Sequence, residues 1–258
     1  MRRHSSGPQK LKAILLCAGK GTRLLPLTVR IPKAMVKIGD KPLVEWLLFL
    51  CKKHGISEIG INLGRNGSKI KKYLQNGDKW GVKVGYSQEK KLLGTAGALH
   101  GFHDFLNSTF IVIYGDILTD INITKMLCFH RSKRAWMTIA LKRSKDPSAS
   151  SGLAVLDDRQ RVKIFLEKPL QTQKEALGGK NAFTNCGVYI CEPKILKYIP
   201  REFCDFGYFV IPEMIKRGKK IFGYDVSKNF FQEIGTIAKV KKAKTKFLSA
   251  KRKSFFLL

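Results

Sequence analysis

The first 115 residues or so alternate between two patterns of hydrophobic positions. Continuous apolar runs and period-two alternations, both typical of strands, occupy residues 12–17, 59–63, 82–86 and 110–114. Apolar residues at helical spacing lie between these runs and predict helices over residues 42–54, 68–75 and 95–106. Strands and helices that alternate in this way indicate parallel strands covered by helices. The pattern therefore predicts a layered α/β domain with its site at the carboxyl ends of the strands.

The pattern changes beyond about residue 135. Strand-like runs follow one another at residues 136–141, 153–156, 162–166 and 187–190. They are separated mainly by turn residues, which predicts strands that are added in antiparallel fashion. A helix over residues 210–216 and a strand over residues 221–226 are expected next.

The composition is that of a globular protein with one large domain or one domain with an embedded subdomain. The chain has 258 residues, of which 44% are hydrophobic and 26% are charged. No apolar run reaches the roughly 18 residues that a membrane-spanning helix needs. The apolar run near the N-terminus, residues 13–18, leads directly into glycines, and we do not interpret it as a signal peptide. These features exclude an integral membrane protein and predict a cytoplasmic one.

The net charge is strongly positive. The chain has 49 Lys and Arg against 19 Asp and Glu, a formal charge of +30, which favours anionic partners in general. Residues 239–258 mix lysines with Phe and Leu, so this segment either contacts an anionic membrane surface or covers the domain as a last helix. No motif that reads RNA or DNA is evident, and we expect no nucleic-acid partner. The six cysteines lack metal-binding spacing and are interpreted as buried free thiols.

A glycine-rich loop follows the first predicted strand. Gly19 and Gly21 place backbone N–H groups where a phosphate can be held, and Arg23 and Lys33 add positive charge. The loop is not the dinucleotide-binding motif, because Leu24 occupies the position of the third glycine. It is not the P-loop of nucleoside triphosphatases either. Two glycines alone form a plain turn more often than a site.

The residues after this loop extend it into a longer pattern. The stretch Leu16-Cys-Ala-Gly-Lys-Gly-Thr-Arg-Leu-Leu-Pro-Leu-Thr28 is followed by Ile31-Pro-Lys-Ala-Met-Val-Lys-Ile38. Further motifs then come in order: Leu93-Gly-Thr-Ala-Gly97, Tyr114-Gly-Asp116, Phe165-Leu-Glu-Lys-Pro169, Asn185-Cys-Gly-Val-Tyr189 and Glu233-Ile-Gly-Thr236. Over about residues 11–245 the chain closely resembles the sugar-1-phosphate nucleotidylyltransferases, or NDP-sugar pyrophosphorylases. Within that family it is most similar to proteins of the mannose-1-phosphate guanylyltransferase type.

The resemblance implies a fold and a division of the chain. The fold would be α/β, a Rossmann-like three-layer domain with a mixed, mainly parallel central sheet and a small antiparallel addition. Residues 11–247 would form the nucleotidyltransferase domain, with a nucleotide-binding part over about 11–120 and a sugar-binding part over about 121–236. Residues 1–10 are then expected to be a flexible basic lead-in, and residues 248–258 a basic and apolar tail.

The reaction that the resemblance implies joins a nucleoside triphosphate to a sugar 1-phosphate and releases pyrophosphate. Both substrates are anions, so the protein must neutralise charge and align them, and no protein nucleophile is required. The resemblance assigns Arg23 and Lys33 to the departing pyrophosphate. It assigns the nucleotide to Ala18, Gly19, Gly21, Thr22, Gly94 and Thr95. A homo-oligomer is left open.

Two carboxylates are candidates for binding Mg²⁺. Asp116 follows an apolar strand and a glycine, at the strand end where a doubly wound fold places its site. Mg²⁺ takes one or two carboxylates together with substrate phosphates, whereas a turn or capping role is the alternative for this Asp. The family usually has Asp before Ile-Gly-Thr, and this chain has Glu233. We predict Mg²⁺ at Asp116 and Glu233, where the longer Glu233 either binds after a backbone adjustment or marks a weakened site.

Four residues are candidates for the sugar side. By resemblance Glu167 would contact sugar hydroxyls and Lys168 the sugar phosphate. Gly152 would let the backbone approach closely, and Asn185 would donate to and accept from hydroxyls. Taken without the resemblance, the same residues are a charged turn, a bend and a turn residue.

The choice of base is predicted from Glu89, eight residues before Gly97. A carboxylate accepts hydrogen bonds and donates none, which matches the N1–H and N2–H₂ edge of guanine. Relatives that use thymidine or uridine commonly have an amide in this region, and Gln88 is adjacent. We favour GTP with a mannose-like sugar. A transferase that uses UTP, dTTP or CTP is the alternative.

Some positions depart from the family pattern. Leu25 stands where many relatives have Arg, and Leu92 where many have Pro. Together with Glu233 they raise a second alternative, a catalytically weakened relative that binds nucleotide sugars and regulates a partner. Residues 203–207 contain the letters Asp-Phe-Gly of protein kinases, but no catalytic-loop motif precedes them, and we interpret the match as coincidence.

Overall fold

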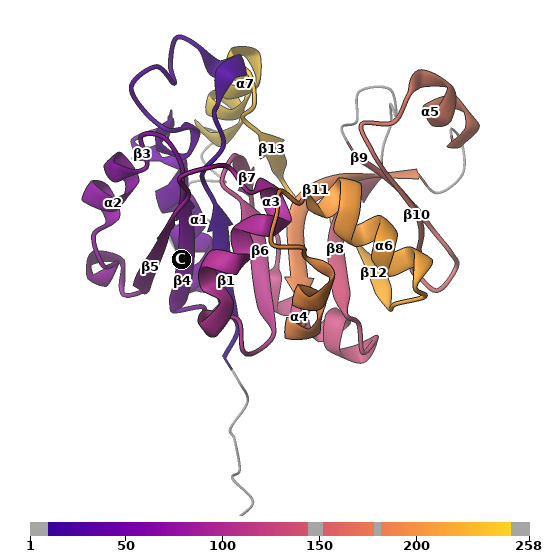
Figure 1. Cartoon of the computed structure of the whole chain (residues 1–258). Helices are drawn as coiled ribbons and strands as arrows, with labels where there is room; N and C mark the ends of the chain where they lie inside the picture. The colour runs from indigo at the N-terminus through magenta and orange to yellow at the C-terminus, as the bar shows by residue number, and fades with distance from the viewer. Residues whose placement is uncertain (1–9, 144–151, 178–181, 249–258) are drawn as a thin grey trace, which may run out of the picture.

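A nine-stranded mixed sheet forms the centre of the molecule (Figure 1). The computed structural model describes residues 10–143, 152–177 and 182–248. Along the sheet the order is β10-β9-β11-β6-β1-β4-β5, with β8 beside β11 and β12 beside β8. The strands are β1 (Lys12–Leu16), β4 (Glu58–Leu63), β5 (Lys83–Gln88), β6 (Phe110–Tyr114), β8 (Met137–Arg143), β9 (Gly152–Leu156), β10 (Val162–Glu167), β11 (Ala182–Cys191) and β12 (Ile221–Asp225).

Helices and two small antiparallel sheets complete the fold. The α-helices are α1 (Leu43–Lys53), α2 (Ser68–Leu74), α3 (Gly94–Gly97), α4 (Ile123–Ser132), α5 (Gln171–Leu177), α6 (Ile211–Lys216) and α7 (Ile237–Leu248). Short 3₁₀ helices are η1 (Thr22–Leu24), η2 (Lys33–Met35), η3 (Asp78–Trp80), η4 (Ala98–Phe105) and η6 (Pro193–Tyr198), and η7 (Phe206–Val210) is a π-helical turn. The small sheets pair β2 (Lys37–Ile38) with β3 (Lys41–Pro42), and β7 (Ile117–Thr119) with β13 (Phe231–Glu233).

Strand β1 lies in the middle of a parallel half, between β4 and β6. The chain passes from β1 through α1 to β4 and through α2 to β5, and then returns to β6 on the other side of β1. This reversal makes a topological switch point, where the loops at the carboxyl ends of neighbouring strands diverge and leave a crevice. The four strands and the first two helices predicted for this half are present, with boundaries within two residues.

Strand β11 joins this half to the rest of the sheet. It runs antiparallel to β6 and pairs with β8 along most of its length, while its first residues, 182–184, also pair with β9. Its register with β8 shifts between Asn185 and Tyr189, where Gly187 has a φ of +62°. In the sheet as a whole, β10 and β11 run opposite to the other strands. The predicted α/β class with a mixed, mainly parallel sheet and a small antiparallel addition is confirmed.

Helices cover both faces of the sheet and make three layers. On one face α1, α2 and α4 pack on the strands through a core that includes Leu47 and Ile61. On the other face η4, η7 and α6 pack through a core that includes Leu99 and Val112. Helix α7 closes a third cluster, in which the ring of Phe247 packs edge-on against an α1 indole with their centres 4.6 Å apart. A last helix over the domain, one alternative for the C-terminal segment, is therefore present.

Some elements differ from the sequence prediction. The helix predicted over residues 95–106 is α3 followed by η4, with non-helical backbone at Phe102. A Cβ at Gly101 would lie 1.9 Å from Ser87 Oγ, so η4 lies tightly against β5, and this packing overrides the regular helix. Helices α4 and α5 and strands β7 and β13 were not predicted. Each strand of the β7–β13 pair has only three residues and a partner far away in the sequence, so neither makes a local pattern.

The expected lead-in and tail, and with them the membrane contact predicted for the tail, fall mainly on residues 1–9 and 249–258, outside the described residues. No helix in the described part of the chain is long and apolar enough to cross a bilayer.

Candidate active site

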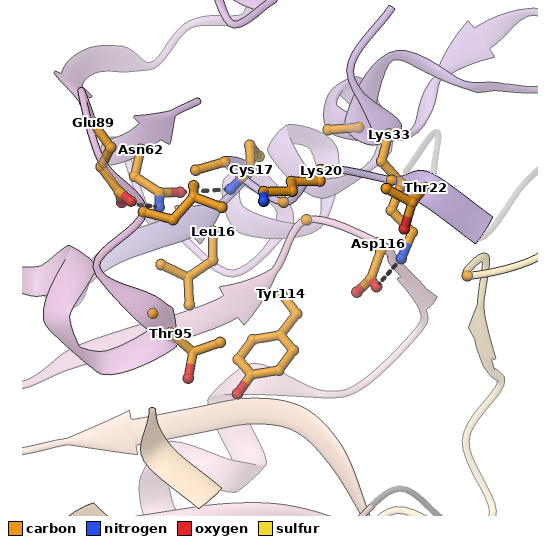
Figure 2. Close-up of a pocket in the computed structure, with 18 of the residues that line it drawn as sticks. Leu16, Cys17, Lys20, Thr22, Lys33, Asn62, Glu89, Thr95, Tyr114 and Asp116 are labelled. Atoms are coloured by element: carbon orange, nitrogen blue, oxygen red, sulfur yellow. Dashed lines mark hydrogen bonds and ion pairs between the residues drawn. The ribbon is translucent and has the colours of Figure 1, made fainter. Parts of the chain in front are cut away.

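A cavity of about 370 Å³ lies at the carboxyl ends of the parallel strands (Figure 2). Its walls include the loops that follow β1, β5 and β6 and the end of strand β4 at Asn62, because parallel strands end at the same edge of a sheet. The predicted residues that line this nucleotide cavity are Ala18, Gly19, Gly21, Thr22, Arg23, Lys33, Glu89, Gly94, Thr95 and Asp116. The structure thus brings together every residue predicted for the nucleotide, along with Arg23, Lys33 and one predicted metal ligand.

The glycine-rich loop leaves the sheet where β1 ends. Gly21 has a φ of +66°, in the left-handed region that favours glycine, and Thr28 Oγ1 donates to its carbonyl oxygen at 2.7 Å. A Cβ at Gly21 would lie 3.1 Å from Thr28 Cγ2. The following η1 buries Leu24 and leaves Arg23 exposed at the cavity. Arg23 therefore lies at the cavity, while the buried Leu24 and the hydrogen bond from Thr28 hold the loop in place.

An ion pair lies in the nucleotide cavity. Lys33 Nζ, from η2, is 2.5 Å from Asp116 Oδ2, just after β6 (Figure 2). The two side chains are 15% and 23% exposed, so water screens their attraction only in part. Gly115 permits this position, because a Cβ there would lie 2.7 Å from Cys17 Sγ. The Lys33 ammonium group and the Asp116 carboxylate, whose oxygens can bind a hard metal ion, are thus in direct contact in the cavity.

The turn before α3 is held by an aspartate from a distant segment. Thr95 donates to Asp205 Oδ1 from its backbone N–H at 2.7 Å and from its hydroxyl at 2.9 Å. Gly94 has a φ of +82°, and a Cβ there would lie 2.5 Å from the carbonyl oxygen of Cys204. Asp205 also lines the nucleotide cavity. It was not among the predicted site residues.

A second cavity, of about 530 Å³, adjoins the first and holds the predicted sugar side. The predicted residues that line this sugar cavity are Arg23, Asp116, Glu167, Lys168, Asn185 and Glu233. The two cavities share Arg23, Tyr114 and Asp116. Ligands in the two cavities would therefore meet at these three residues.

Burial perturbs Glu167 in the sugar cavity. Burial raises the pKa of this carboxyl to about 7, against the opposing charge of Lys168 and with a further contribution from Asp205. A Cβ at Gly152 would lie 2.9 Å from Glu167 Oε2, and one at Gly207 would lie closer still. Gly152 therefore lies directly beside Glu167 and leaves room for its carboxyl, but it is not among the described residues that line the sugar cavity.

Asn185 is held in place by its neighbours. Its Nδ2 donates to the Tyr189 hydroxyl at 2.7 Å, and its Oδ1 accepts from the Gly187 N–H at 3.0 Å. The Tyr189 hydroxyl donates in turn to that of Tyr114 at 3.2 Å. Burial raises the pKa of both phenols, so they stay neutral hydrogen-bonding groups. This chain of side chains connects the sugar cavity to the wall that both cavities share.

The two predicted metal ligands lie on neighbouring backbone segments. Glu233 is in β13, which pairs with β7, and the N–H of Ile234 donates to the carbonyl oxygen of Asp116 at 2.9 Å. Both carboxylates line the sugar cavity, and Glu233 accepts a hydrogen bond from Lys239. The described residues contain no group of three or more His, Cys, Asp and Glu able to hold a metal by themselves. Two carboxylates completed by substrate phosphates are the oxygen set that Mg²⁺ prefers, so the residues fit this ion.

Asn62, Asp205 and Lys239 also line the cavities, although none of them was predicted as a site residue. Asn62 could have been found, because it is the one polar residue in the predicted strand over residues 59–63, where a buried polar group needs partners. In the structure it is 3% exposed. Lys239 lies near the N-terminus of α7, where a positive charge is unfavourable unless it is paired, and that is also a signal. Asp205 gives no local signal, because its partner Thr95 is 110 positions away.

Comparison with known proteins places the fold and the motifs in one family. The nucleotidyl transferase family matches residues 12–250. A UTP–glucose-1-phosphate uridylyltransferase of Synechocystis sp. is 36% identical over 231 residues, which cover 84% of this chain and 58% of that protein. A mannose-1-phosphate guanylyltransferase of Mycobacterium tuberculosis is 31% identical over 230 residues, which cover 88% of this chain and 62% of that protein. The chain thus spans about six-tenths of the length of these curated relatives.

Solved structures share the architecture. HddC from Yersinia pseudotuberculosis, complexed with GMP-PN, has a TM-score of 0.76 and 25% identity, over 92% of this chain and 99% of that one. A UDP-glucose pyrophosphorylase complexed with UDP-glucose has a TM-score of 0.78 over 93% of this chain and 98% of that one, and at 22% identity it supports the fold alone. The resemblance predicted from the sequence is confirmed, and the chain belongs to the nucleotidyl transferase family.

Proposed function

We propose that this protein is an enzyme that transfers a nucleotidyl group from a nucleoside triphosphate to a sugar 1-phosphate. The observation that carries the proposal is the pair of cavities that meet at Arg23, Tyr114 and Asp116. One cavity contains the glycine-rich loop, and the other contains a carboxyl, an amide and a lysine able to bind a sugar phosphate. Two anion-binding cavities with a common wall suit direct transfer between two bound substrates.

In the proposed reaction the triphosphate lies on the loop 19–22. An anionic phosphate oxygen of the sugar 1-phosphate attacks the α-phosphorus, so the step needs no general base. The bond from the α-phosphorus to the bridging oxygen breaks, and its electron pair leaves with pyrophosphate. Arg23 and Lys33 neutralise the negative charge on that leaving group.

The sugar and the metal would be held on the other side of the common wall. Lys168 would contact the sugar phosphate, while Glu167 and Asn185 bind hydroxyls. Asp116 and Glu233 would hold Mg²⁺ together with the phosphates. When bound, Mg²⁺ supplies positive charge and alignment to the phosphates.

We favour GTP and a mannose-like sugar 1-phosphate as substrates. The Glu89 carboxylate lies in the wall of the nucleotide cavity, and it can accept from the N1–H and N2–H₂ groups of guanine. The Mycobacterium tuberculosis relative is a mannose-1-phosphate guanylyltransferase, and HddC was solved with GMP-PN. The Synechocystis relative, a uridylyltransferase at 36% identity, supports UTP with glucose 1-phosphate as the second candidate.

The test is pyrophosphate release by the purified protein with Mg²⁺. GTP, UTP, dTTP and CTP are each combined with the 1-phosphates of mannose, glucose, N-acetylglucosamine and heptose. We expect one pair to dominate and Asp116→Ala to lower its turnover at least about a hundredfold, because the substitution removes a metal ligand and the partner of Lys33. Asp104→Ala, at an exposed position of η4, is the matched control and should keep the wild-type rate.

Absence of turnover with every pair, combined with tight binding of a nucleotide or NDP-sugar, would reject the enzymatic proposal. That outcome would favour the regulatory alternative, in which Leu25 and Glu233 mark a weakened site. Glu233→Asp would then test whether the shorter carboxylate is what the reaction lacks.

A further inference from the structure

Asn62 occupies a position between two parts of the nucleotide cavity. It lies near the carboxyl end of β4 and is 3% exposed. Its Oδ1 accepts from the backbone N–H of Cys17 at 2.6 Å, where the chain enters the glycine-rich loop. Its Nδ2 donates to Glu89 Oε1, also at 2.6 Å, where the chain leaves β5 (Figure 2). One side chain therefore connects the start of the phosphate loop to Glu89.

The chemistry of these contacts requires an amide at this position. The group facing the Cys17 N–H must accept, and the group facing the Glu89 carboxylate must donate, so the partners fix the amide orientation. A polar group without such partners would be unfavourable in the buried part of this strand. An aspartate at position 62 would keep the first contact but would place a second carboxylate against Glu89.

Glu89 is held from a second direction as well. Its Oε2 accepts from the backbone N–H of Leu93 at 3.0 Å, one residue before Gly94. Its own backbone N–H donates to the carbonyl oxygen of Leu63. The carboxylate is thus fixed between β4 and the turn that leads into α3. Each oxygen still has a lone pair available for a ligand in the cavity that it lines.

We propose that Asn62 is a positioning residue that fixes the Glu89 carboxylate for contact with the nucleobase and couples it to the phosphate loop through Cys17. The inference rests on the proposed function, because it assumes that a nucleoside triphosphate occupies this cavity. It does not depend on which base is preferred. Loss of Asn62 weakens discrimination between bases, because the Glu89 carboxyl group is then no longer held in one place.

A merely structural role makes a different prediction. If the buried amide only stabilises the fold, its replacement lowers the melting temperature and weakens the binding of both substrates to the same extent. If Asn62 positions Glu89, its replacement affects the two substrates differently. The affinity for the preferred nucleotide and the preference between bases change, whereas the KM of the sugar 1-phosphate does not. This separation follows because Asn62 lines the nucleotide cavity and contacts Glu89 and Cys17, while the sugar residues line the adjoining cavity.

The test is a double-substitution cycle with Asn62→Asp, Glu89→Gln and the two combined. Calorimetry measures binding of GTP and of UTP to the full-length protein, alongside the sugar 1-phosphate KM and the melting temperature. We expect Asn62→Asp to weaken binding of the preferred nucleotide about tenfold and to reduce the difference in affinity between GTP and UTP. In the combined variant the new amide at position 89 donates to the new carboxylate at position 62, so we expect binding and melting temperature to recover above the sum of the single effects. The altered base preference should remain, because an amide now faces the base.

Asn107→Asp is the matched control, since Asn107 is exposed just before β6, at the opposite end of that strand from the site. It should leave every readout unchanged. Should Asn62→Asp fail to fold, Asn62→Ser carries the test, because a serine hydroxyl is too short to replace the contact with Glu89. It should narrow the base preference in the same way.

Three results would overturn the inference while the proposed function stands. The first is unchanged nucleotide binding in the Asn62 variants. The second is a rise in the KM of the sugar 1-phosphate as large as the loss of nucleotide affinity. The third is a combined variant whose binding and melting temperature equal the sum of the two single effects. In each case the wild type still binds a nucleotide. If the wild type binds no nucleoside triphosphate, the proposed function itself fails and the inference fails with it.

Discussion

At the scale of single residues, the carboxylates of the site have different surroundings. Asp116 faces an ammonium group, and Asp205 accepts two hydrogen bonds from Thr95. Glu167 is half-buried, and the loss of solvation raises its pKa to about 7. A carboxyl group with this pKa changes its charge near neutral pH, so the strength of its hydrogen bonds to a sugar hydroxyl depends on pH.

We therefore expect the kcat/KM for the sugar 1-phosphate to rise about tenfold as the pH increases through 7. The ionised carboxylate makes charge-assisted hydrogen bonds to hydroxyls, and the protonated acid does not. Glu167→Gln should remove the pH step and hold kcat/KM at a low value across the same range. Steady-state kinetics between pH 5.5 and 8.5 measure both proteins, with the KM of the nucleotide as an internal control. If kcat/KM of the Gln variant rises by the same factor over this pH range, the pH dependence comes from ionisation of the substrate phosphate and not from Glu167.

At the scale of elements, the segment between β5 and η4 takes its shape from contacts with residues 204–205. Backbone N–H groups of Ala96 and Gly97 donate to the carbonyl oxygen of Cys204, each at 2.9 Å. Gly94 makes this approach possible, since its φ is +82° and its hydrogen faces that same carbonyl. Helix α3 has only four residues, so this docking rather than helix propensity stabilises it.

Gly94→Ala should therefore lower the free energy of unfolding by about 2–4 kcal/mol, through left-handed strain and a backbone clash together. Nucleotide affinity should fall with it, because Gly94 and Thr95 line the nucleotide cavity. Gly55→Ala is the matched control: Gly55 has a φ of +71° but no atom within 4 Å of an added Cβ, so the loss should be about 1 kcal/mol. Chemical denaturation and nucleotide titration measure the two effects. Equal losses in both variants would contradict the docking account.

At the scale of the whole molecule, a polar cluster joins α4, β8 and β11 at the end of β6 opposite to the cavities. His130 is 1% exposed and lies 2.8 Å from Thr138 Oγ1 and 3.1 Å from Glu192 Oε1, measured from its two ring nitrogens. Thr109 donates to the same Glu192 oxygen at 2.8 Å. The hydrogen bond from His130 lowers the pKa of Glu192, and the bond from Thr109 adds to this effect.

The lowered pKa makes the stability of the fold depend on pH. Stabilisation by Glu192 is present above its ordinary pKa of 4.5 and is lost as the pH falls through the lower value of the folded state. Glu192→Gln should reduce the free energy of unfolding by about 1 kcal/mol at pH 7, and the difference from wild type should vanish in acid. Denaturant titrations at pH 7, 5 and 3.5 measure this trend. Glu58→Gln, at a more exposed ion pair, should change stability by less than about 0.5 kcal/mol, and a constant deficit of Glu192→Gln at all three values would refute the linkage.

The sequence by itself determined the parallel half of the fold and the end of the candidate site that contains the glycine-rich loop. Strands buried on both faces make continuous apolar runs, and their carboxyl ends must meet at one edge of the sheet, so the loop at Gly19–Arg23 and Asp116 could be placed together. Lys33 came from the same local motif. The resemblance to the family then supplied Glu167, Asn185 and Glu233 as further site residues.

Only the tertiary structure decided how the rest of the site is assembled. The pairing of β7 with β13 places Glu233 beside Asp116, and the contact with Asp205 fixes Thr95. Asn62 connects Glu89 to the start of the glycine-rich loop. Each of these contacts joins residues far apart in the chain, and the sequence around each residue would look the same without its partner. Local patterns report which face of an element is buried, whereas the choice of partner is set by the packing of the whole sheet.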